Sequence, residues 1–162
     1  MQVFTNATPL ISLAKVQRLN FLEHFFTEIL IPGSVYNEIT QNMKFAYEAD
    51  LIRSCSFLRQ TSVINHTMVV SLRAAGLDLG ESEAISLAAS HNNSLLLMDE
   101  RRGRQIALNL GLKTTGTLGI IVRAKQDGLN DKAKPCLNQL RREGVYISDR
   151  FYLEILTAVD ER

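Results

Sequence analysis

The stretch SLLLMDERRGR, from Ser94 to Arg104, decides the fold predicted for this chain. Four apolar residues, Leu95 to Met98, run directly into Asp99, and no polar residue interrupts them as it would in a strand with one solvated face. Such a run is typical of a strand buried on both faces of a parallel sheet. Asp99 would then stand at the carboxyl end of this strand, where open α/β sheets bind their ligands.

Asp99 has two interpretations from its position alone. A carboxylate at a buried strand tip, next to Glu100 and a basic helix start, suits a metal or phosphate site. Alternatively, Asp99 is an N-cap that accepts hydrogen bonds from the free amide groups of the helix that follows. The chemical interpretation therefore requires further acids that converge on the same edge of the sheet.

Strands and helices alternate along the rest of the chain. Thr8, Asn130 and Ser148 are predicted as N-caps of three of the helices. Alternation at this spacing indicates βαβ units and a parallel sheet covered with helices on both faces. The other predicted strands are Gln2 to Thr5, Glu28 to Ile31, an edge strand within Phe57 to Ile64, and Lys113 to Thr115.

Length and composition predict a single domain over residues 1–162. The chain is 46% hydrophobic and 22% charged with a net charge of +1, so any contact with nucleic acid must come from a local basic patch. Cys55 and Cys136 lie far apart without metal-ligand spacing, which argues against a zinc site and a disulfide scaffold. No apolar run is long enough for a bilayer and no signal peptide is recognisable, so we expect a cytoplasmic protein without membrane contact.

Polar residues at predicted strand ends and helix starts converge on one edge of the sheet. Magnesium and manganese prefer hard oxygen ligands, so acids from separate elements would form a site for metal-assisted phosphodiester cleavage. The alternative is that helix dipoles favour acids in first turns, which alone accounts for Glu81, Glu83 and Glu100. The spacing leaves both interpretations open. The converging residues are Asn6, Glu38, Glu81, Glu83 and Asp99, with Glu100 adjacent.

Basic residues follow Asp99 directly. Arg101, Arg102 and Arg104 are predicted RNA contacts, because cationic side chains carry most of the sequence-independent affinity for nucleic acid. Thr117, near a later helix start, is predicted to contact phosphate or to hold Asp99 in place. The alternatives are a solvated helix face for the arginines and a capping role for Thr117.

Three segments together resemble the DUF3368 family of PIN-domain proteins over most of the chain. The resemblance implies a PIN-like three-layer α/β/α sandwich with a central, mainly parallel sheet. It also implies an endoribonuclease that depends on Mg²⁺ or Mn²⁺, of the kind that serves as toxin in bacterial and archaeal toxin–antitoxin pairs, with RNA as substrate, an antitoxin protein as partner and a homodimer as assembly. The segments are NATPLISLAK from Asn6, LDLGESEAI from Leu77, and LMDERRGR from Leu97 through TGTLG from Thr115.

Residue by residue, the resemblance assigns metal-binding and catalytic roles to Asn6, Glu38, Glu81 and Asp99. Glu81 suits the family pattern of helix followed by strand, and Glu83 is the second candidate for that role. The family normally has aspartate at the position of Asn6. An amide oxygen can still coordinate magnesium but brings no negative charge, so we expect metal affinity and nuclease activity to be weakened or lost.

Two other classes of function remain open. A catalytically silent PIN-like module would bind RNA or protein without cleavage, which Asn6 favours. A receiver-like phosphotransfer domain would use Asp99 as phospho-acceptor, but it should carry further acids on the first strand and would leave the PIN-like segments unexplained. All of these interpretations require the first and central strands to be neighbours in the sheet.

Overall fold

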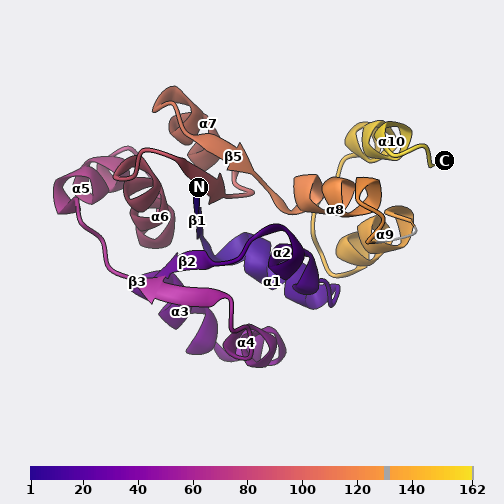
Figure 1. Cartoon of the computed structure of the whole chain (residues 1–162), viewed down its shortest axis with the longest axis horizontal. Helices are drawn as coiled ribbons and strands as arrows, with labels where there is room; N and C mark the ends of the chain where they lie inside the picture. Colours follow the sequence, from indigo (N-terminus) through magenta and orange to yellow (C-terminus); the bar gives the residue numbers. More distant parts are fainter. Residues whose placement is uncertain (130–131, 162) are drawn as a thin grey trace.

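A five-stranded, entirely parallel sheet forms the centre of the molecule, with the strand order β3-β2-β1-β4-β5 (Figure 1). The computed structural model describes residues 1–129 and 132–161, so the predicted N-cap Asn130 lies outside the described residues. The parallel sheet predicted from the sequence is confirmed. Its strands are β1 (Gln2–Thr5), β2 (Ile29–Pro32), β3 (Leu58–Thr61), β4 (Ser94–Leu97) and β5 (Lys113–Thr115).

Helices cover both faces of the sheet and complete the three-layer sandwich. Adjacent residues of β1 point to opposite faces, so Val3 joins the apolar cluster under α1–α4 and α8–α10, whereas Phe4 joins the cluster under α5–α7. The helices are α1 (Ala7–Lys15), α2 (Asn20–Phe25), α3 (Gly33–Thr40), the 3₁₀ turn η1 (Met43–Phe45), α4 (Ala46–Arg53), α5 (His66–Ala74), α6 (Leu79–Ala89), α7 (Arg101–Asn109), α8 (Thr117–Gln126), α9 (Lys134–Arg142) and α10 (Asp149–Ala158).

Strand β4 is buried on both faces, as its apolar run predicts. Leu96, Leu97 and Met98 have no exposed surface. Strand β1 pairs with β4 along its whole length, with Thr5 opposite Leu97. The first and central strands are therefore neighbours, which was the condition for Asn6 and Asp99 to share one edge.

Several element boundaries differ from the predictions, and β4 is Ser94–Leu97, one residue earlier than the apolar run Leu95 to Met98. Strand β2 begins at Ile29, one residue late, and the edge strand β3 covers only Leu58–Thr61, because it pairs with β2 and can be no longer than its partner. The predicted N-cap Thr8 is wrong, since α1 already begins at Ala7 and Asn6 precedes it. Proline is tolerated there because the first-turn amides have no partner within the helix. Ser148 is confirmed as the N-cap of α10.

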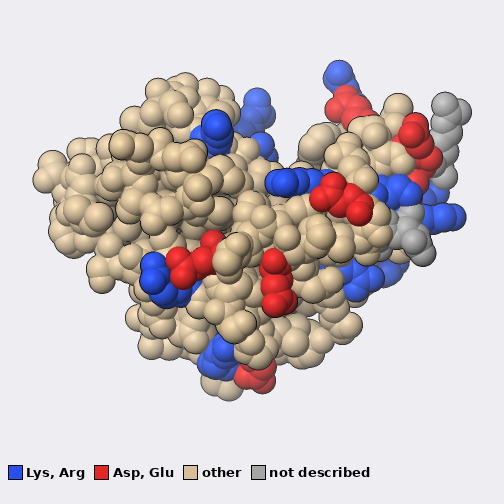
Figure 2. All heavy atoms as spheres, viewed as in Figure 1, with Lys and Arg blue, Asp and Glu red and all other residues tan. Residues whose placement is uncertain are grey.

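Charged side chains of both signs are interspersed over the face seen in Figure 2, in keeping with the small net charge. No helix within residues 1–129 or 132–161 is long and apolar enough to cross a membrane.

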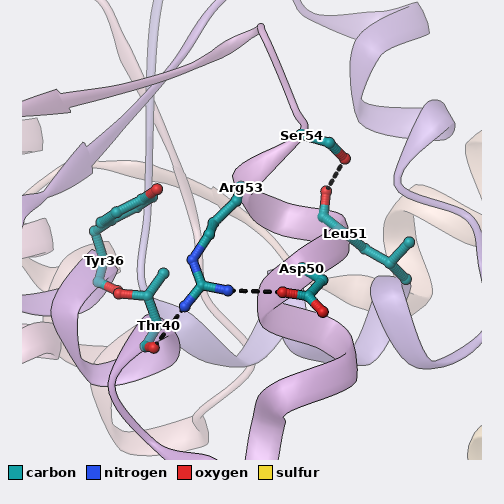
Figure 3. Close-up of polar contacts among 6 residues, drawn as sticks. All are labelled: Tyr36, Thr40, Asp50, Leu51, Arg53 and Ser54. Carbon is teal, nitrogen blue, oxygen red and sulfur yellow. Dashed lines mark hydrogen bonds and ion pairs between the residues drawn. The ribbon is translucent and has the colours of Figure 1, made fainter.

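Helix α3, which carries Glu38, is tied to α4 by a polar contact (Figure 3). Arg53 of α4 donates from Nη2 to the carbonyl oxygen of Thr40, at 2.8 Å, and pairs through Nη1 with Asp50, also at 2.8 Å. The hydroxyl of Thr40 in turn donates to the carbonyl of Tyr36. The bond from Arg53 satisfies the carbonyl of Thr40, in the last turn of α3, which the helix itself leaves free.

Candidate active-site edge and adjoining groove

The carboxyl ends of the parallel strands bring the four predicted site residues to one edge of the sheet. Asn6 follows β1 directly, and its backbone N–H donates to the carbonyl of Leu97 at 3.4 Å. Asp99 follows β4 after Met98, and Glu38 lies on α3, which begins directly after β2. Helix α6 precedes β4 and runs against it, so its first turn, with Glu81, starts at this edge.

Four carboxylates, which we call the acidic cluster, interact at this edge: Glu38, Asp78, Glu81 and Glu100. Asp78 is the N-cap of α6, and its Oδ1 accepts a hydrogen bond from the backbone N–H of Glu81 at 2.8 Å. Gly80 allows α3 and α6 to approach closely, because a Cβ there would lie only 3.0 Å from Cγ2 of Val35 on α3, and it would lie 3.4 Å from Oε2 of Glu38. Sequence reasoning missed Asp78, although an Asp followed three residues later by Glu is the sequence signature of a helix start.

Two members of the acidic cluster, Glu81 and Glu38, have raised pKa values. Burial, then the charge of Asp78 and a hydrogen bond with it, then the charge of Glu100, raise the pKa of Glu81 to about 7. Partial burial and the charge of Asp78 also raise the pKa of Glu38. Carboxylates crowded in this way repel one another, and a cation among them would relieve the repulsion. Glu83 is not among the groups whose charges act on Glu81 or Glu38.

Asp99 is held by the start of α8. Its Oδ1 accepts from the backbone N–H of Thr117 at 2.7 Å, and its Oδ2 accepts from the hydroxyl of the same residue at 2.6 Å. The absence of a side chain at Gly116 makes this possible, because a Cβ there would lie 2.5 Å from Oδ1 of Asp99. The prediction that Thr117 holds Asp99 is thus confirmed. The predicted capping of the following helix by Asp99 is wrong, because Glu100 precedes α7 and Asp99 binds a different helix.

Asn6 has a buried side-chain oxygen without a partner. The residue is 4% exposed, and Oδ1 accepts no hydrogen bond from any residue within the described ranges. The hydroxyls of Ser34, at the start of α3, and Ser82, at the start of α6, are likewise buried without a partner there. Leaving such an acceptor unpaired costs about 1–3 kcal/mol. The unpaired oxygen of Asn6 thus suits a cation or a water at this edge.

The side-chain oxygens at this edge are chemically suited to bind a divalent cation. No three Asp, Glu, His or Cys side chains among the described residues are grouped closely enough to surround an ion by themselves. Carboxylates of Glu38 and Glu81 and the unpaired oxygen of Asn6 are nevertheless the hard ligands that Mg²⁺ and Mn²⁺ take, usually together with several waters. Asp99 can take part as well, because each carboxylate oxygen keeps a second lone pair when it accepts from Thr117.

A groove of about 940 Å³ adjoins the edge. Residues of α1, η1, α7 and α10 and of the β5–α8 and α9–α10 connections line it, together with Asp99, which lies between β4 and α7. Figure 1 shows α7 and α10 standing apart on either side of the β5–α8 connection, and the outline in Figure 2 is indented between them. Four cationic side chains line the groove: Lys15, Lys44, Arg101 and Arg104.

The structure separates Arg102 from the two arginines that line the groove. Its guanidinium donates to the carbonyl of Ala75, at the end of α5. It also covers Gly76, where a Cβ would lie 3.1 Å from Nη1 of Arg102 and where the φ of +100° favours glycine. The guanidinium of Arg102 therefore joins α7 to the α5–α6 connection.

A comparison with protein-family models gives a match that covers nearly the whole chain. The family model DUF3368, described as a PIN domain, matches residues 2–161. No curated protein and no solved structure matches the chain. The matched range includes the whole sheet and every residue of the acidic cluster. Since the match covers nearly the full length, the chain belongs to the DUF3368 family of PIN-domain proteins.

Proposed function

We propose that this chain is an endoribonuclease that depends on Mg²⁺ or Mn²⁺, with Asn6, Glu38, Glu81 and Asp99 as its metal-binding and catalytic residues. Family membership supports a nuclease-like module, because PIN domains are generally nucleases that bind divalent metals. We further propose that Asn6, at a position where the family normally has aspartate, weakens or abolishes the activity.

The observation that carries the proposal is that the acidic cluster adjoins a basic groove. Glu100, whose charge acts on Glu81, is flanked in the sequence by Asp99 and Arg101, which both line the groove. A phosphate backbone drawn into the groove by its cations would therefore pass next to crowded carboxylates. Positive charge for binding beside oxygen ligands for a metal is what cleavage of a phosphodiester requires.

In this proposal each residue has a defined task. A bound divalent ion supplies a water of lowered pKa and offsets the charge that develops on the phosphate. Glu38, Glu81 and Oδ1 of Asn6 hold it, and Asp99 contributes the lone pairs that Thr117 leaves free. Arg101, Arg104 and Thr117 would contact the RNA backbone and orient it. Thr117 also keeps the carboxylate of Asp99 from rotating away.

Cleavage of an end-labelled single-stranded RNA in the presence of Mn²⁺ tests the proposal. We expect Asn6→Asp to gain activity at least tenfold over the wild type, because a charged ligand replaces an amide. Adding Glu81→Gln to Asn6→Asp should abolish the gain, while adding Glu83→Gln should preserve it. Glu83 is a matched control, as it lies on the same helix outside the acidic cluster. Equal inertness of all four proteins, or equal activity with and without Glu81, would refute the proposal.

The family resemblance also leads us to propose that the chain is the toxin of a toxin–antitoxin pair, with a homodimer as its assembly and an antitoxin that inserts against the edge. Expression in a bacterial host tests the toxin role. Asn6→Asp should arrest growth, and the further change Glu81→Gln should restore it. Size-exclusion chromatography with light scattering measures the assembly, and a monomer at micromolar concentration would contradict the homodimer.

The second candidate is a catalytically silent module that binds RNA or protein. It is favoured by the amide at position 6 and by Asp99, both of whose oxygens already accept from Thr117. Such a module would bind RNA in EDTA and would remain inert after Asn6→Asp. The family match argues against the receiver-like alternative, which left the PIN-like segments unexplained.

A further inference from the structure

An exposed aromatic ring stands at the groove, and the proposed catalytic edge does not use it. Tyr146, in the connection between α9 and α10, is 88% exposed and lines the groove. Phe151, in the first turn of α10, and Phe45, in η1, line it too. One exposed ring alone would need no explanation, but three aromatic residues that line the same groove gather apolar surface there, and such surface marks a binding site.

The charge of the groove indicates what kind of ligand it takes. None of Lys15, Lys44, Arg101 and Arg104 forms an ion pair with a described residue. Lys15 donates only to the backbone carbonyl of Glu143. The acids of the groove are Glu143 and Asp99, and Asp99 is already bound to Thr117. The groove therefore complements a polyanion.

Aromatic rings and cations that form no ion pair with a described residue share one groove, with Nζ of Lys44 lying 5.7 Å from the centroid of the Phe45 ring. Together they match the two surfaces of a single-stranded nucleic acid. Its phosphates meet the cations, and its unstacked bases offer flat faces to aromatic rings. A duplex presents the same phosphates but keeps its bases stacked inside. An acidic peptide would meet the cations but has no need of an exposed ring.

We propose that the groove binds the single-stranded RNA next to the cleavage site and that one base stacks on Tyr146. The inference rests on the proposed function, because it assigns the groove to the same substrate. Asp99 also lines the groove, so an RNA strand with one base stacked on Tyr146 would continue along the groove to the proposed catalytic edge of the sheet. Tyr146 thereby makes unpaired RNA the preferred substrate, with little preference among the four bases, since every base has a face that can stack.

Fluorescence anisotropy with a labelled single-stranded RNA, measured in EDTA so that no cleavage occurs, tests the stacking. Tyr146→Ala should raise Kd about fivefold or more, the usual effect of losing one stacked base. Tyr146→Phe keeps the ring and should retain the affinity of the wild type. Tyr47→Ala is the matched control, since Tyr47 is exposed but lies outside the groove. An unchanged Kd for Tyr146→Ala, or an equal loss for Tyr47→Ala, would overturn the inference.

Competition and salt dependence identify the ligand class. Unlabelled single-stranded RNA should displace the probe at much lower concentration than the matching duplex or polyglutamate, and displacement by all three alike would overturn the assignment. Lys44→Ala should lower the slope of log Kd against log salt by about one, while Tyr146→Ala should leave it unchanged.

The two proposals fail separately. If Asn6→Asp cleaves RNA while Tyr146→Ala binds RNA like the wild type, the nuclease proposal is supported and the stacking on Tyr146 is refuted. If Tyr146 is needed for binding while Asn6→Asp stays inert, the nuclease proposal falls, and the groove belongs to the RNA-binding alternative.

Discussion

Replacing Gly116 by alanine should detach Asp99 from α8. The backbone at Gly116 has φ −127° and ψ −174°, an extended conformation that alanine adopts without strain. The obstacle is the space for the new methyl group, which would lie 2.5 Å from Oδ1 of Asp99 and 3.4 Å from the backbone oxygen of Met98. The strand end cannot yield easily, so the carboxylate of Asp99 must move away.

The expected loss of stability follows from the hydrogen bonds that Asp99 accepts. Two hydrogen bonds to a charged acceptor contribute about 1.5–3 kcal/mol each to the free energy of unfolding. Asp99 is only half-buried, so water replaces part of that interaction. We therefore expect Gly116→Ala to lower the free energy of unfolding by about 2–4 kcal/mol. In a domain of this size such a loss lowers Tm by roughly 5–15 °C. Thr117→Val removes only the hydroxyl bond and should lose about half as much.

Urea denaturation followed by circular dichroism measures these losses. Gly33→Ala serves as the matched control, because its new Cβ would meet nothing closer than the Gln60 side chain at 3.8 Å. We expect this control to be neutral or slightly stabilising, by up to about 1 kcal/mol. If Gly116→Ala unfolds within about 0.5 kcal/mol of the wild type, Asp99 does not cap α8 in solution and the reasoning is refuted.

Two further predictions concern carboxylates. The pKa of Glu81 in the folded protein is about 7, above its value in the unfolded chain, so the free energy of unfolding should fall as pH rises from about 4.5 to 7. Urea titrations at several pH values should show that Glu81→Gln flattens this dependence. An unchanged slope would contradict the raised pKa. Glu161 accepts from the backbone N–H groups of Ala133 (2.6 Å) and Lys134 (3.1 Å) at the start of α9. Glu161→Gln, which keeps one acceptor, should lower the free energy of unfolding by about 1–3 kcal/mol in the same assay. The control Glu154→Gln, which breaks only an exposed ion pair with Arg150, should lower it by no more than about 0.5 kcal/mol.

The sequence was sufficient for features that depend on local pattern. The uninterrupted apolar run before Asp99 predicted a strand buried on both faces, and β4 is that strand. The positions of Asn6 and Asp99 followed from the rule that parallel strands end at one edge. Ser148 was predicted correctly as an N-cap, because a capping side chain accepts from a backbone N–H only two or three residues further along the chain.

Features that depend on contacts between distant segments were beyond such patterns. Holding Asp99 was only one of three roles predicted for Thr117, because no local rule connects its helix with the end of β4, and only the structure decides between them. Three arginines in one helical turn look alike in sequence, yet only the packing of α7 against the α5–α6 connection turns Arg102 away from the groove. Likewise, the exposure of Tyr146 depends on how α9 and α10 pack, and its local sequence carries no sign of it.

The place of β1 in the sheet has a consequence for biosynthesis. Among the five strands β1 is synthesised before the others, yet it lies at the middle of the sheet, where Gln2 pairs with Ser94. Such pairing across a long sequence separation slows folding, and one edge of β1 stays open on the ribosome until β4 emerges. The contact of Asp99 with Thr117 must wait still longer. The candidate site therefore assembles only after the start of α8 has been synthesised.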